Sequence, residues 1–517
     1  MSASTPTTIT PGIEGLPRQV DLVVAGLGVT GAGVALDAAS RGLSVLAVDA
    51  HDLAFGTSRW SSKLVHGGLR YLAHGQVGVA HESAVERRIL METTAPHLTH
   101  ALPMLVPLHD SVGHLQAAVT RAGFAAGDLL RLGTRTRRET LPRPRRVSAT
   151  EALSLAPALR VSGLRGGILG WDGQLEDDAR LVVTIARTAA AHGAHVRTHA
   201  RVLSAGGGRV ALRDELTGAE TEIAARMVVN ATGVWAGELA DVRLRPSRGT
   251  HVVLRDGSLP GLRVCITAPV PGSTSRFVMA LPQPDGTVYV GLTDEPVDGP
   301  VPDVPEPTEP EIGFLLDTVS ATLAHPLSRA DVAGAFAGLR PLLDAHPDDP
   351  GGSTSDLSRR HAVLTGEDGV VTVVGGKLTT YRRMAQDAVD AVLVAAGEAP
   401  RPCRTHRLPL AGAGDRAALA AVDADPRLVR RFGTDAPLVM QNAREVTGLS
   451  DGELLAPAAA HVPVTLAELV FGVTHEGAAD VDDLLERRTR VALVPADRPL
   501  AEPLALRALA FSAAVPG

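Results

Sequence analysis

The chain has 517 residues, so it can bury a large core and is expected to form two or more domains. Its 50 basic and 57 acidic residues leave a net charge of −7, which argues against wholesale nucleic-acid binding. The only cysteines are Cys265 and Cys403, and no CxxC pattern occurs. This excludes a disulfide framework and a thiolate metal site, and favours a reducing compartment.

Residues 1–18 are rich in Ser, Thr and Pro and lack an apolar core, so we expect a disordered leader rather than a signal peptide. No run of about 18 apolar residues occurs, and no membrane-spanning helix is predicted. The histidines, such as the pairs His97/His100 and His192/His195, are more typical of surface residues than of metal ligands, so no metal site is predicted.

Residues 21–49 read as a strand, a glycine turn, a helix, a second strand and an acid. Gly26, Gly28 and Gly31 supply a tight turn, close approach of the backbone to a pyrophosphate, and close contact of helix and strand. Asp49, 18 residues after Gly31, is placed to accept a hydrogen bond from a ribose hydroxyl. The unit predicts a dinucleotide site.

Residues 55–72 are too rich in Gly, Ser and charged side chains for a core element, and this composition predicts a loop that lines a site. A helix is expected over 77–93, with Glu82, Glu86 and Arg87 on its solvent-facing side.

Lysine usage is unusual, because 48 of the 50 basic residues are arginines and the only lysines are Lys63 and Lys377. Both lie in motifs. The bias indicates that lysine is kept where a compact ammonium is required and a planar guanidinium would not fit. The alternative is that both are ordinary solvent-exposed lysines.

Two further strands are expected to end at the nucleotide. The strand that begins at Met227 runs into Ala231, Thr232 and Gly233, and the strand over 370–374 runs into a second glycine turn that opens a helix.

A second domain is indicated by a strand-like piece over 104–108 and by period-two alternation over 243–295, which is typical of antiparallel sheet. Beyond residue 402 the chain is rich in Ala and Leu and is expected to be helical. The predicted domains are a leader (1–18), a discontinuous dinucleotide-binding domain (19–99, 166–242 and 357–399), a substrate-binding or cap domain (100–165 and 243–356) and a helical C-terminal domain (400–517).

With these motifs the chain resembles the FAD-dependent glycerol-3-phosphate dehydrogenases, from about residue 20 to residues 486–490. Of the matching segments, Ser61–Leu72, Gly338–Leu342 and Gly375–Arg382 are specific to this family. Gly26–Gly33 and Asn230–Gly233 are shared by many flavoproteins. The segments are Gly26–Gly33, Ser61–Leu72, Asp177–Leu181, Asn230–Gly233, His251–Val253, Gly338–Leu342 and Gly375–Arg382. The fold class implied is α/β, with a Rossmann-like FAD-binding domain, an antiparallel-sheet substrate domain and a helical C-terminal domain.

The resemblance implies oxidation of sn-glycerol 3-phosphate to dihydroxyacetone phosphate, with hydride passing from C2 to N5 of FAD and electrons then to a membrane quinone. Arg70, Tyr71 and Lys377 could bind the phosphate. A neutral His251 is the candidate base for the C2 hydroxyl, although a purely structural histidine is the alternative. Arg340 resembles the family arginine that holds the substrate.

Catalytic roles are thus predicted for His251, Arg340 and Lys377, and substrate binding for these three with Arg70 and Tyr71. Backbone N–H groups at the second glycine turn would stabilise negative charge on the flavin. Arg59 and Trp60 depart from the family pattern, because this stretch is small in some members. The predicted cofactor-binding residues are Gly26, Gly28, Gly31, Asp49, Thr57, Ser58, Ser61, Ser62, Lys63, Gly67, Gly68, Ala231, Thr232, Gly233, Gly375, Gly376, Lys377, Leu378 and Thr379.

Noncovalent FAD is expected, because no loop offers an obvious attachment, and denaturation should release the flavin. Three alternatives are a glycerophosphate oxidase that uses O₂, an amino-acid oxidase of the same fold class, and a non-catalytic flavoprotein that works through residues 121–146. The pair Lys377 and Arg70 favours phosphate over an amino-acid substrate.

Because quinone is lipid-soluble, the protein is expected in the cytoplasm, peripheral to the inner face of the cell membrane. The predicted partners are glycerol 3-phosphate, a quinone and the membrane surface, without nucleic acid, and a homodimer is left open. Residues 117–146 are the candidate membrane contact, and the alternative for this stretch is a solvated arginine-rich loop. The residues that would contact the membrane are Phe124, Leu129, Leu130, Leu132, Arg121, Arg131, Arg135, Arg137, Arg138, Arg143, Arg145 and Arg146.

Overall fold

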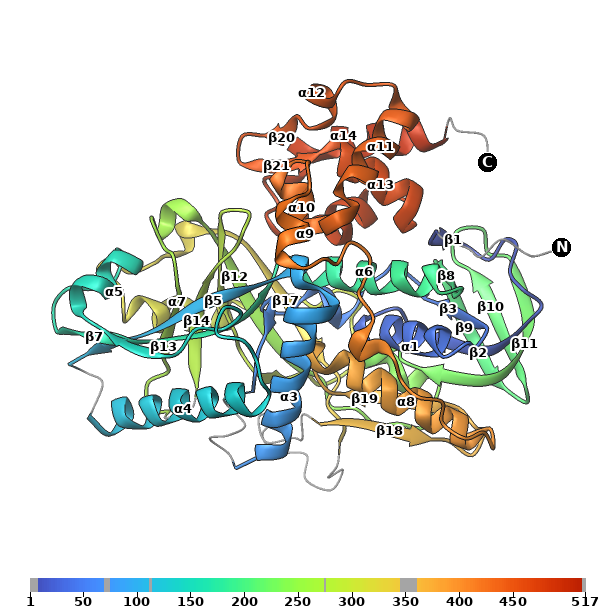
Figure 1. The fold of residues 1–517 in the computed structure, drawn as a ribbon, viewed down its shortest axis with the longest axis horizontal. Coiled ribbons are helices and arrows are strands. Elements are labelled where there is room, and N and C mark those ends of the chain that lie inside the picture. The colour runs from blue at the N-terminus through green and yellow to red at the C-terminus, as the bar shows by residue number, and fades with distance from the viewer. Residues whose placement is uncertain (1–7, 69–74, 111–113, 274–275, 345–359, 514–517) are drawn as a thin grey trace.

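The structure is a computed structural model, and it describes residues 8–68, 75–110, 114–273, 276–344 and 360–513 (Figure 1). Two large sheets lie side by side, and a helical C-terminal region covers α6 (Figure 1). No helix in these ranges is long and apolar enough to cross a membrane.

The first sheet has nine strands within the described ranges, in the order β1-β8-β3-β2-β11-β10-β9, with β19 beside β11 and β18 beside β19. Strands β8, β3, β2, β11 and β19 run parallel. The strands are β1 (Thr10–Pro11), β2 (Gln19–Ala25), β3 (Val45–Val48), β8 (His195–Thr198), β9 (Ala200–Gly206), β10 (Arg209–Asp214), β11 (Glu220–Asn230), β18 (His361–Thr365) and β19 (Val371–Gly375).

Both faces of the parallel strands are buried, which explains their continuous apolar runs. Helices α1 (Val29–Ser40), α6 (Asp178–Ala191) and α8 (Tyr381–Ala395) pack on one face. Strand β10 pairs antiparallel with β9 and with the first part of β11, and these three strands supply apolar residues that cover the other face.

The second sheet has ten strands within the described ranges, in the order β16-β12-β15-β14-β13-β5-β7-β4, with β17 beside β12 and β6 beside β7. One face packs on α5 (Ala149–Leu155) and α7 (Glu309–Ser320). The strands are β4 (Leu64–Val65), β5 (Thr99–His109), β6 (Arg145–Val147), β7 (Leu164–Leu175), β12 (Ser247–Arg255), β13 (Cys265–Pro269), β14 (Phe277–Pro282), β15 (Thr287–Gly291), β16 (Glu295–Pro296) and β17 (Val332–Arg340).

The C-terminal region has its own apolar core, in which Phe432 and Phe471 meet edge to face. Its elements are α9 (Arg416–Ala420), α10 (Pro426–Phe432), α11 (Ala436–Thr447), α12 (Asp451–Leu454), β20 (Pro457–Ala459), β21 (Val462–Thr465), α13 (Leu466–Glu476) and α14 (Arg498–Ala513).

Helices α3 (Val77–Ile89) and α4 (His114–Gly133) complete the long elements. The short 3₁₀ and π turns are η1 (Thr57–Arg59), η2 (Leu90–Thr94), η3 (Pro96–Leu98), η4 (Gly233–Glu238), η5 (Asp256–Ser258), η6 (Arg329–Asp331), η8 (Leu378–Thr380), η9 (Thr405–Arg407), η10 (Gly433–Asp435), η11 (Asp483–Arg488) and η12 (Val491–Leu493).

Two predicted boundaries are wrong. Strand β1 pairs with β8 and Ile9 is buried, so the described end of the 1–18 leader is ordered by the first sheet. Residues 166–175 belong to β7, which pairs antiparallel with β5 of the second sheet rather than with the first sheet. The short β4 also joins β7. Such pairing between distant strands leaves no local signal in a glycine-rich stretch.

Two predictions of solvent exposure are also wrong, one for the outer side of α3 and one for His97. Glu86 and Arg87 of α3 are buried, because each has an ion-pair partner on another element, Arg382 and Asp172 respectively. His97 is buried too.

Candidate active site

A cavity of about 680 Å³ lies where the carboxyl ends of the parallel strands meet the second sheet. Its wall is formed by the turn after β2, the end of β3, residues 55–62, the turn after β11, residues 375–379, and parts of β12 and β17. Open α/β sheets bind ligands at this edge.

The turn after β2 has no room for side chains. Gly26 has φ +94°, and a Cβ there would lie 2.7 Å from the Ala231 carbonyl oxygen. A Cβ on Gly31 would lie 1.8 Å from the Gly26 carbonyl oxygen. Ser58 Oγ accepts a hydrogen bond from Val29 N–H at 2.9 Å. The N-terminus of α1 therefore meets the cavity with the glycine backbone of Gly26 and Gly28 beside the Ser58 hydroxyl, an arrangement that suits a pyrophosphate.

Asp49, at the end of β3, also lines the cavity. Its Oδ2 accepts from Leu27 N–H at 2.6 Å, and its Oδ1 accepts from His51 N–H at 2.9 Å. Each carboxylate oxygen keeps a further acceptor position, so the geometry is compatible with the predicted ribose contact.

The second glycine turn closes another side. Gly375 and Gly376 both have φ +75°, and a Cβ on Gly376 would lie 2.4 Å from Met384 Sδ. The turn precedes η8 and α8, so its backbone lies at the N-terminal end of a 15-residue helix. Such an end favours negative charge on a bound group.

His251 lies on β12 and is buried. Its Nε2 is 2.8 Å from Ser62 Oγ, and its ring stacks on Phe336 with centroids 4.8 Å apart. Burial, with the nearby charges of Lys63 and Arg340, lowers the pKa of His251 well below its ordinary value. The imidazole is therefore neutral and can accept a proton.

Four cationic side chains of the described residues line the cavity, Arg201, Arg276, Arg340 and Lys377, and the last two are those that the sequence predicted. Arg340 ends β17, with Nη1 3.2 Å from Asp294 Oδ1 and Nη2 donating to the Thr293 carbonyl at 3.2 Å. Lys377 precedes η8, and its Nζ donates to Ser83 Oγ at 2.8 Å. The cavity can therefore combine a neutral base with two positive charges.

Most of the predicted site residues line the cavity. They are Gly26, Gly28, Asp49, Thr57, Ser58, Ser61, Ser62, Ala231, Thr232, Gly233, His251, Arg340, Gly375, Gly376, Lys377, Leu378 and Thr379. Arg70 and Tyr71 lie outside the described residues.

Four predicted cofactor contacts, Gly31, Lys63, Gly67 and Gly68, are not on the cavity wall, and Gly31 instead provides the predicted close contact of helix and strand. Lys63 is buried behind the wall, where its Nζ donates to Asp178 Oδ2 at 2.8 Å and to the Arg59 carbonyl at 2.6 Å. It anchors this loop from behind, so lysine here serves a buried polar contact.

Sequence reasoning missed several wall residues, and also Ser83, which is not on the wall but contacts Lys377. Asp294 accompanies Arg340, and Ser83 orients Lys377 because its hydroxyl also donates to the Val79 carbonyl at 2.8 Å. An apolar arm of the cavity is built by alternate residues of neighbouring strands and by α4, and period-two alternation could have pointed to it. Its residues include Met104, Val106, Phe124, Phe277 and Met279.

Comparison with known proteins agrees with this geometry. A model of the FAD dependent oxidoreductase family matches residues 21–382, and one of the C-terminal domain of alpha-glycerophosphate oxidase matches residues 403–505. Glycerol-3-phosphate dehydrogenase 1 of Mycobacterium tuberculosis is 51% identical over 486 residues, covering 93% of this chain and 92% of that protein. The glycerol-3-phosphate dehydrogenase of Mycobacterium leprae is 38% identical, covering 92% and 82%.

Among solved structures, the glycerol-3-phosphate dehydrogenase from Bacillus halodurans complexed with FAD superposes with a TM-score of 0.72. It is 27% identical, and the match covers 96% of this chain and 91% of that chain.

The bare glycine turn, the acid after β3 and the family match define an FAD-dependent oxidoreductase. The cavity volume lies within the usual range for cofactor sites, and its walls offer contacts from the turn after β2 to His251. Within this class, the chain belongs to the FAD-dependent glycerol-3-phosphate dehydrogenase family. The predicted family, fold class and FAD cofactor are confirmed.

Proposed function

We propose that the protein oxidises sn-glycerol 3-phosphate to dihydroxyacetone phosphate. The observation that carries this proposal is the neutral His251 on the wall of one cavity with Arg340 and Lys377. The relatives, which are glycerol-3-phosphate dehydrogenases by name, support the same substrate. When bound, FAD supplies the acceptor for the two electrons that leave C2 of the substrate.

In this proposal His251 takes the proton of the C2 hydroxyl, and the Ser62 hydroxyl at Nε2 orients the ring. Arg340 and Lys377 hold the phosphate dianion, because charge-assisted hydrogen bonds from cations are the strong contacts for such a group. Asp294 and Ser83 keep the two cations in place before the substrate arrives. We assign Arg70 and Tyr71 to the same anion as a proposal from the sequence alone.

The test is a steady-state assay of the purified protein with glycerol 3-phosphate and an artificial electron acceptor, with and without O₂. We expect turnover that continues under anaerobic conditions and is absent with glycine or proline as substrate. No turnover with glycerol 3-phosphate under either condition would reject the proposal.

We further propose a quinone as the natural acceptor, in keeping with the dehydrogenase names of the relatives. The match of residues 403–505 to an oxidase C-terminal domain favours O₂ as the second candidate. The same assay separates the two, because an oxidase would form one hydrogen peroxide per substrate oxidised.

A quinone acceptor requires contact with a bilayer, and we propose that α4 and the residues after it provide that contact on the inner face of the cell membrane. The predicted surface is smaller than expected: Arg131 is buried beside Asp128, Phe124 lines the cavity and Leu130 packs on α3. The side chains left exposed are Leu129, Leu132, Arg121, Arg135, Arg137, Arg138, Arg143, Arg145 and Arg146.

Liposome co-sedimentation tests this surface. Binding should require anionic lipid, weaken with salt and disappear when Arg135, Arg137 and Arg138 are changed to Glu. Binding that is indifferent to these three changes would move the contact to another part of the molecule.

A further inference from the structure

The C-terminal region, residues 403–513, lines no part of the cavity in the described structure. It nevertheless contacts the segment that does. Residues 55–62, here called the cofactor segment, contribute Phe55, Thr57, Ser58, Trp60 and both Ser61 and Ser62 to the wall.

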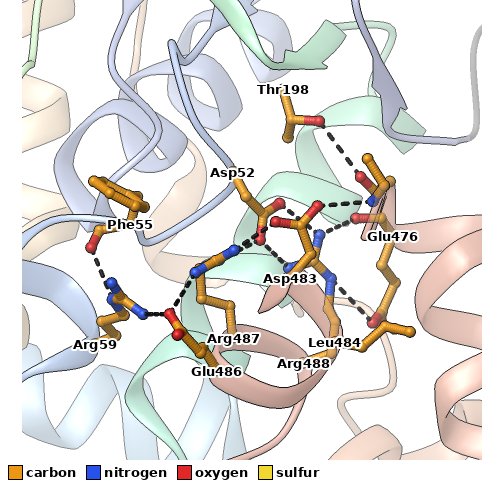
Figure 2. A network of polar contacts seen from close by, with 12 residues as sticks. Asp52, Phe55, Arg59, Thr198, Glu476, Asp483, Leu484, Glu486, Arg487 and Arg488 are labelled. Atoms are coloured by element: carbon orange, nitrogen blue, oxygen red, sulfur yellow. Dashed lines mark hydrogen bonds and ion pairs between the residues drawn. The ribbon is translucent and has the colours of Figure 1, made fainter. Parts of the chain in front are cut away.

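Arg59 is the cofactor-segment residue that forms an ion pair with the C-terminal region (Figure 2), and Phe55 also contacts that region, because its ring centroid lies 5.7 Å from Arg487 Cζ. Its side chain is buried, its Nη1 pairs with Glu486 of η11, and its Nε donates to the Phe55 carbonyl at 2.8 Å. The guanidinium also lies 4.1 Å from the Trp60 ring centroid and 5.1 Å from that of Phe55. One cation thus fixes two aromatic residues of the cavity wall.

The same turn of η11 holds the chain just before the cofactor segment (Figure 2). Asp52 is fully buried and accepts from Arg487 Nε at 2.8 Å and from Arg488 Nη1 and Nη2, each at 2.7 Å. Glu486 is shared, because Arg487 Nη1 also donates to it at 2.9 Å. Without Glu486, Arg59 and Arg487 would be two guanidiniums with no carboxylate between them.

Trp60 contacts residues of β17, which ends at Arg340 and lies beside β12 with His251, so a movement of Trp60 would displace residues near both side chains. A Cβ on Gly338 would lie 2.5 Å from Trp60 Cβ, so β17 and Trp60 are in close contact. Trp60 stacks on Phe336 at 5.8 Å, and Phe336 stacks on His251 at 4.8 Å. Thr57 Oγ1 also donates to the Leu339 carbonyl, next to Arg340.

We propose that Arg59 is a positioning residue through which Glu486 of the C-terminal region holds the cofactor segment in its FAD-binding conformation. This deepens the proposed function and rests on it for the catalytic part. It also gives the bulky Arg59-Trp60 pair, which departs from the family pattern, a defined role: the pair couples a region outside the cavity to the cavity wall.

The test compares two interdomain ion pairs of similar exposure. Glu486 pairs with Arg59 and its side chain is 28% exposed, whereas Asp435 pairs with Arg187 of α6 at 2.9 Å and its side chain is 26% exposed. Each ion pair joins the C-terminal region to the part of the chain that surrounds the first sheet. Of the two carboxylates, only Glu486 contacts the cofactor segment. Glu486→Gln is therefore the test variant and Asp435→Asn its matched control.

The readout is the rate of FAD release from the diluted holoenzyme, followed by the rise in flavin fluorescence. We expect Glu486→Gln and Arg59→Met each to release FAD about tenfold faster than the parent, as for loss of one charged hydrogen bond. Asp435→Asn should stay within about twofold. The double variant Arg59→Met/Glu486→Gln should release FAD less than about threefold faster than Arg59→Met, because the two residues share one ion pair and the double variant loses in addition only the contacts of Glu486 with Arg487 and Arg498.

Unchanged FAD release in Glu486→Gln would overturn the proposal, and so would equal acceleration in Asp435→Asn. If Arg59→Met does not fold, the rate of FAD release from Glu486→Gln tests the proposal alone, because Glu486 is only half-buried and its variant is expected to fold. FAD release needs no substrate, so a parent protein that fails to oxidise glycerol 3-phosphate would reject the proposed function and leave this inference standing.

Discussion

At the scale of single residues, the two lysines of this arginine-rich chain have different tasks. Lys63 is buried behind the loop wall, whereas Lys377 lines the cavity and is oriented by Ser83. The Ser83 hydroxyl bridges Lys377 and the Val79 carbonyl, so the ammonium is aimed before substrate binds. A guanidinium is longer and planar and cannot reproduce this contact.

We therefore expect Lys377→Arg to reduce transition-state stabilisation by about 2–4 kcal/mol, measured as kcat/KM for glycerol 3-phosphate. Arg383→Lys is the control, because Arg383 is close in sequence, pairs with Asp387 and does not line the cavity. Unchanged turnover and KM in the Lys377 variant would contradict the assignment.

The pH dependence of catalysis should report His251. Burial, with Lys63 and Arg340, holds the pKa of this imidazole well below its ordinary 6.5. A base works in its neutral form, so activity is lost only as the pH falls through this lowered value. We expect kcat at saturating substrate, measured from pH 5 to 9, to show no fall centred near about 6.5; kcat is used because kcat/KM would also report the second ionisation of the substrate phosphate. A fall centred there would mean that His251 is solvated or is not the base.

At the scale of elements, α3 connects the cavity to both sheets. Three buried residues on this helix each contact another element: Ser83 meets Lys377, Glu86 meets Arg382 of α8, and Arg87 meets Asp172 of β7. The contact to Arg382 is bidentate, with Nε at 2.7 Å and Nη2 at 2.6 Å from the two carboxylate oxygens. The helix is thus held by charges as well as by apolar packing.

Glu86→Gln leaves a buried guanidinium without its carboxylate, and such a break costs about 3–5 kcal/mol. We expect a corresponding fall in the apparent Tm in calorimetry. Glu82→Gln on the same helix is the control and should change stability by less than about 0.5 kcal/mol, because Glu82 is only partly buried. Equal effects of both variants would show that Arg382 is compensated by other groups.

At the scale of the whole molecule, the C-terminal region is joined to the part of the chain that surrounds the first sheet by buried ion pairs and by close packing. Arg180 of α6 makes two hydrogen bonds to Glu476 of α13, and Arg431 pairs with Asp177. His97 lies in the same interface, where a Cβ on Gly433 would be 2.9 Å from its Cγ. Burial, with the charges of Arg187 and Arg180, lowers the pKa of His97 to about 3.

This histidine should make the molecule acid-sensitive. Between pH 6.5 and 3 the unfolded chain binds a proton at His97 that the folded chain does not, so stability falls as the pH falls, by about 1.4 kcal/mol per pH unit. We expect the apparent Tm of the parent to drop more between pH 6.5 and 5.5 than that of His97→Leu. The exposed His325→Gln should behave as the parent. Equal drops in parent and His97→Leu would rule out a contribution from His97.

The sequence by itself determined the features that depend on neighbours along the chain. The turn after β2, the acid that follows β3, the strands β12, β14 and β15 and the helix that follows the second glycine turn were all expected from local patterns, and each is present in the structure. Motif resemblance added His251, Arg340 and Lys377, and all three line the cavity.

Only the tertiary structure decided which charges are buried and what they hold. Glu86 and Arg382 are 296 positions apart, and Arg59 and Glu486 are 427 apart. A charged residue on a helix has the same local pattern whether it faces water or a distant partner, so its burial could not be predicted. Strand β7 joined the second sheet for the same reason, because strand pairing is set by packing between distant segments rather than by the residues of one strand.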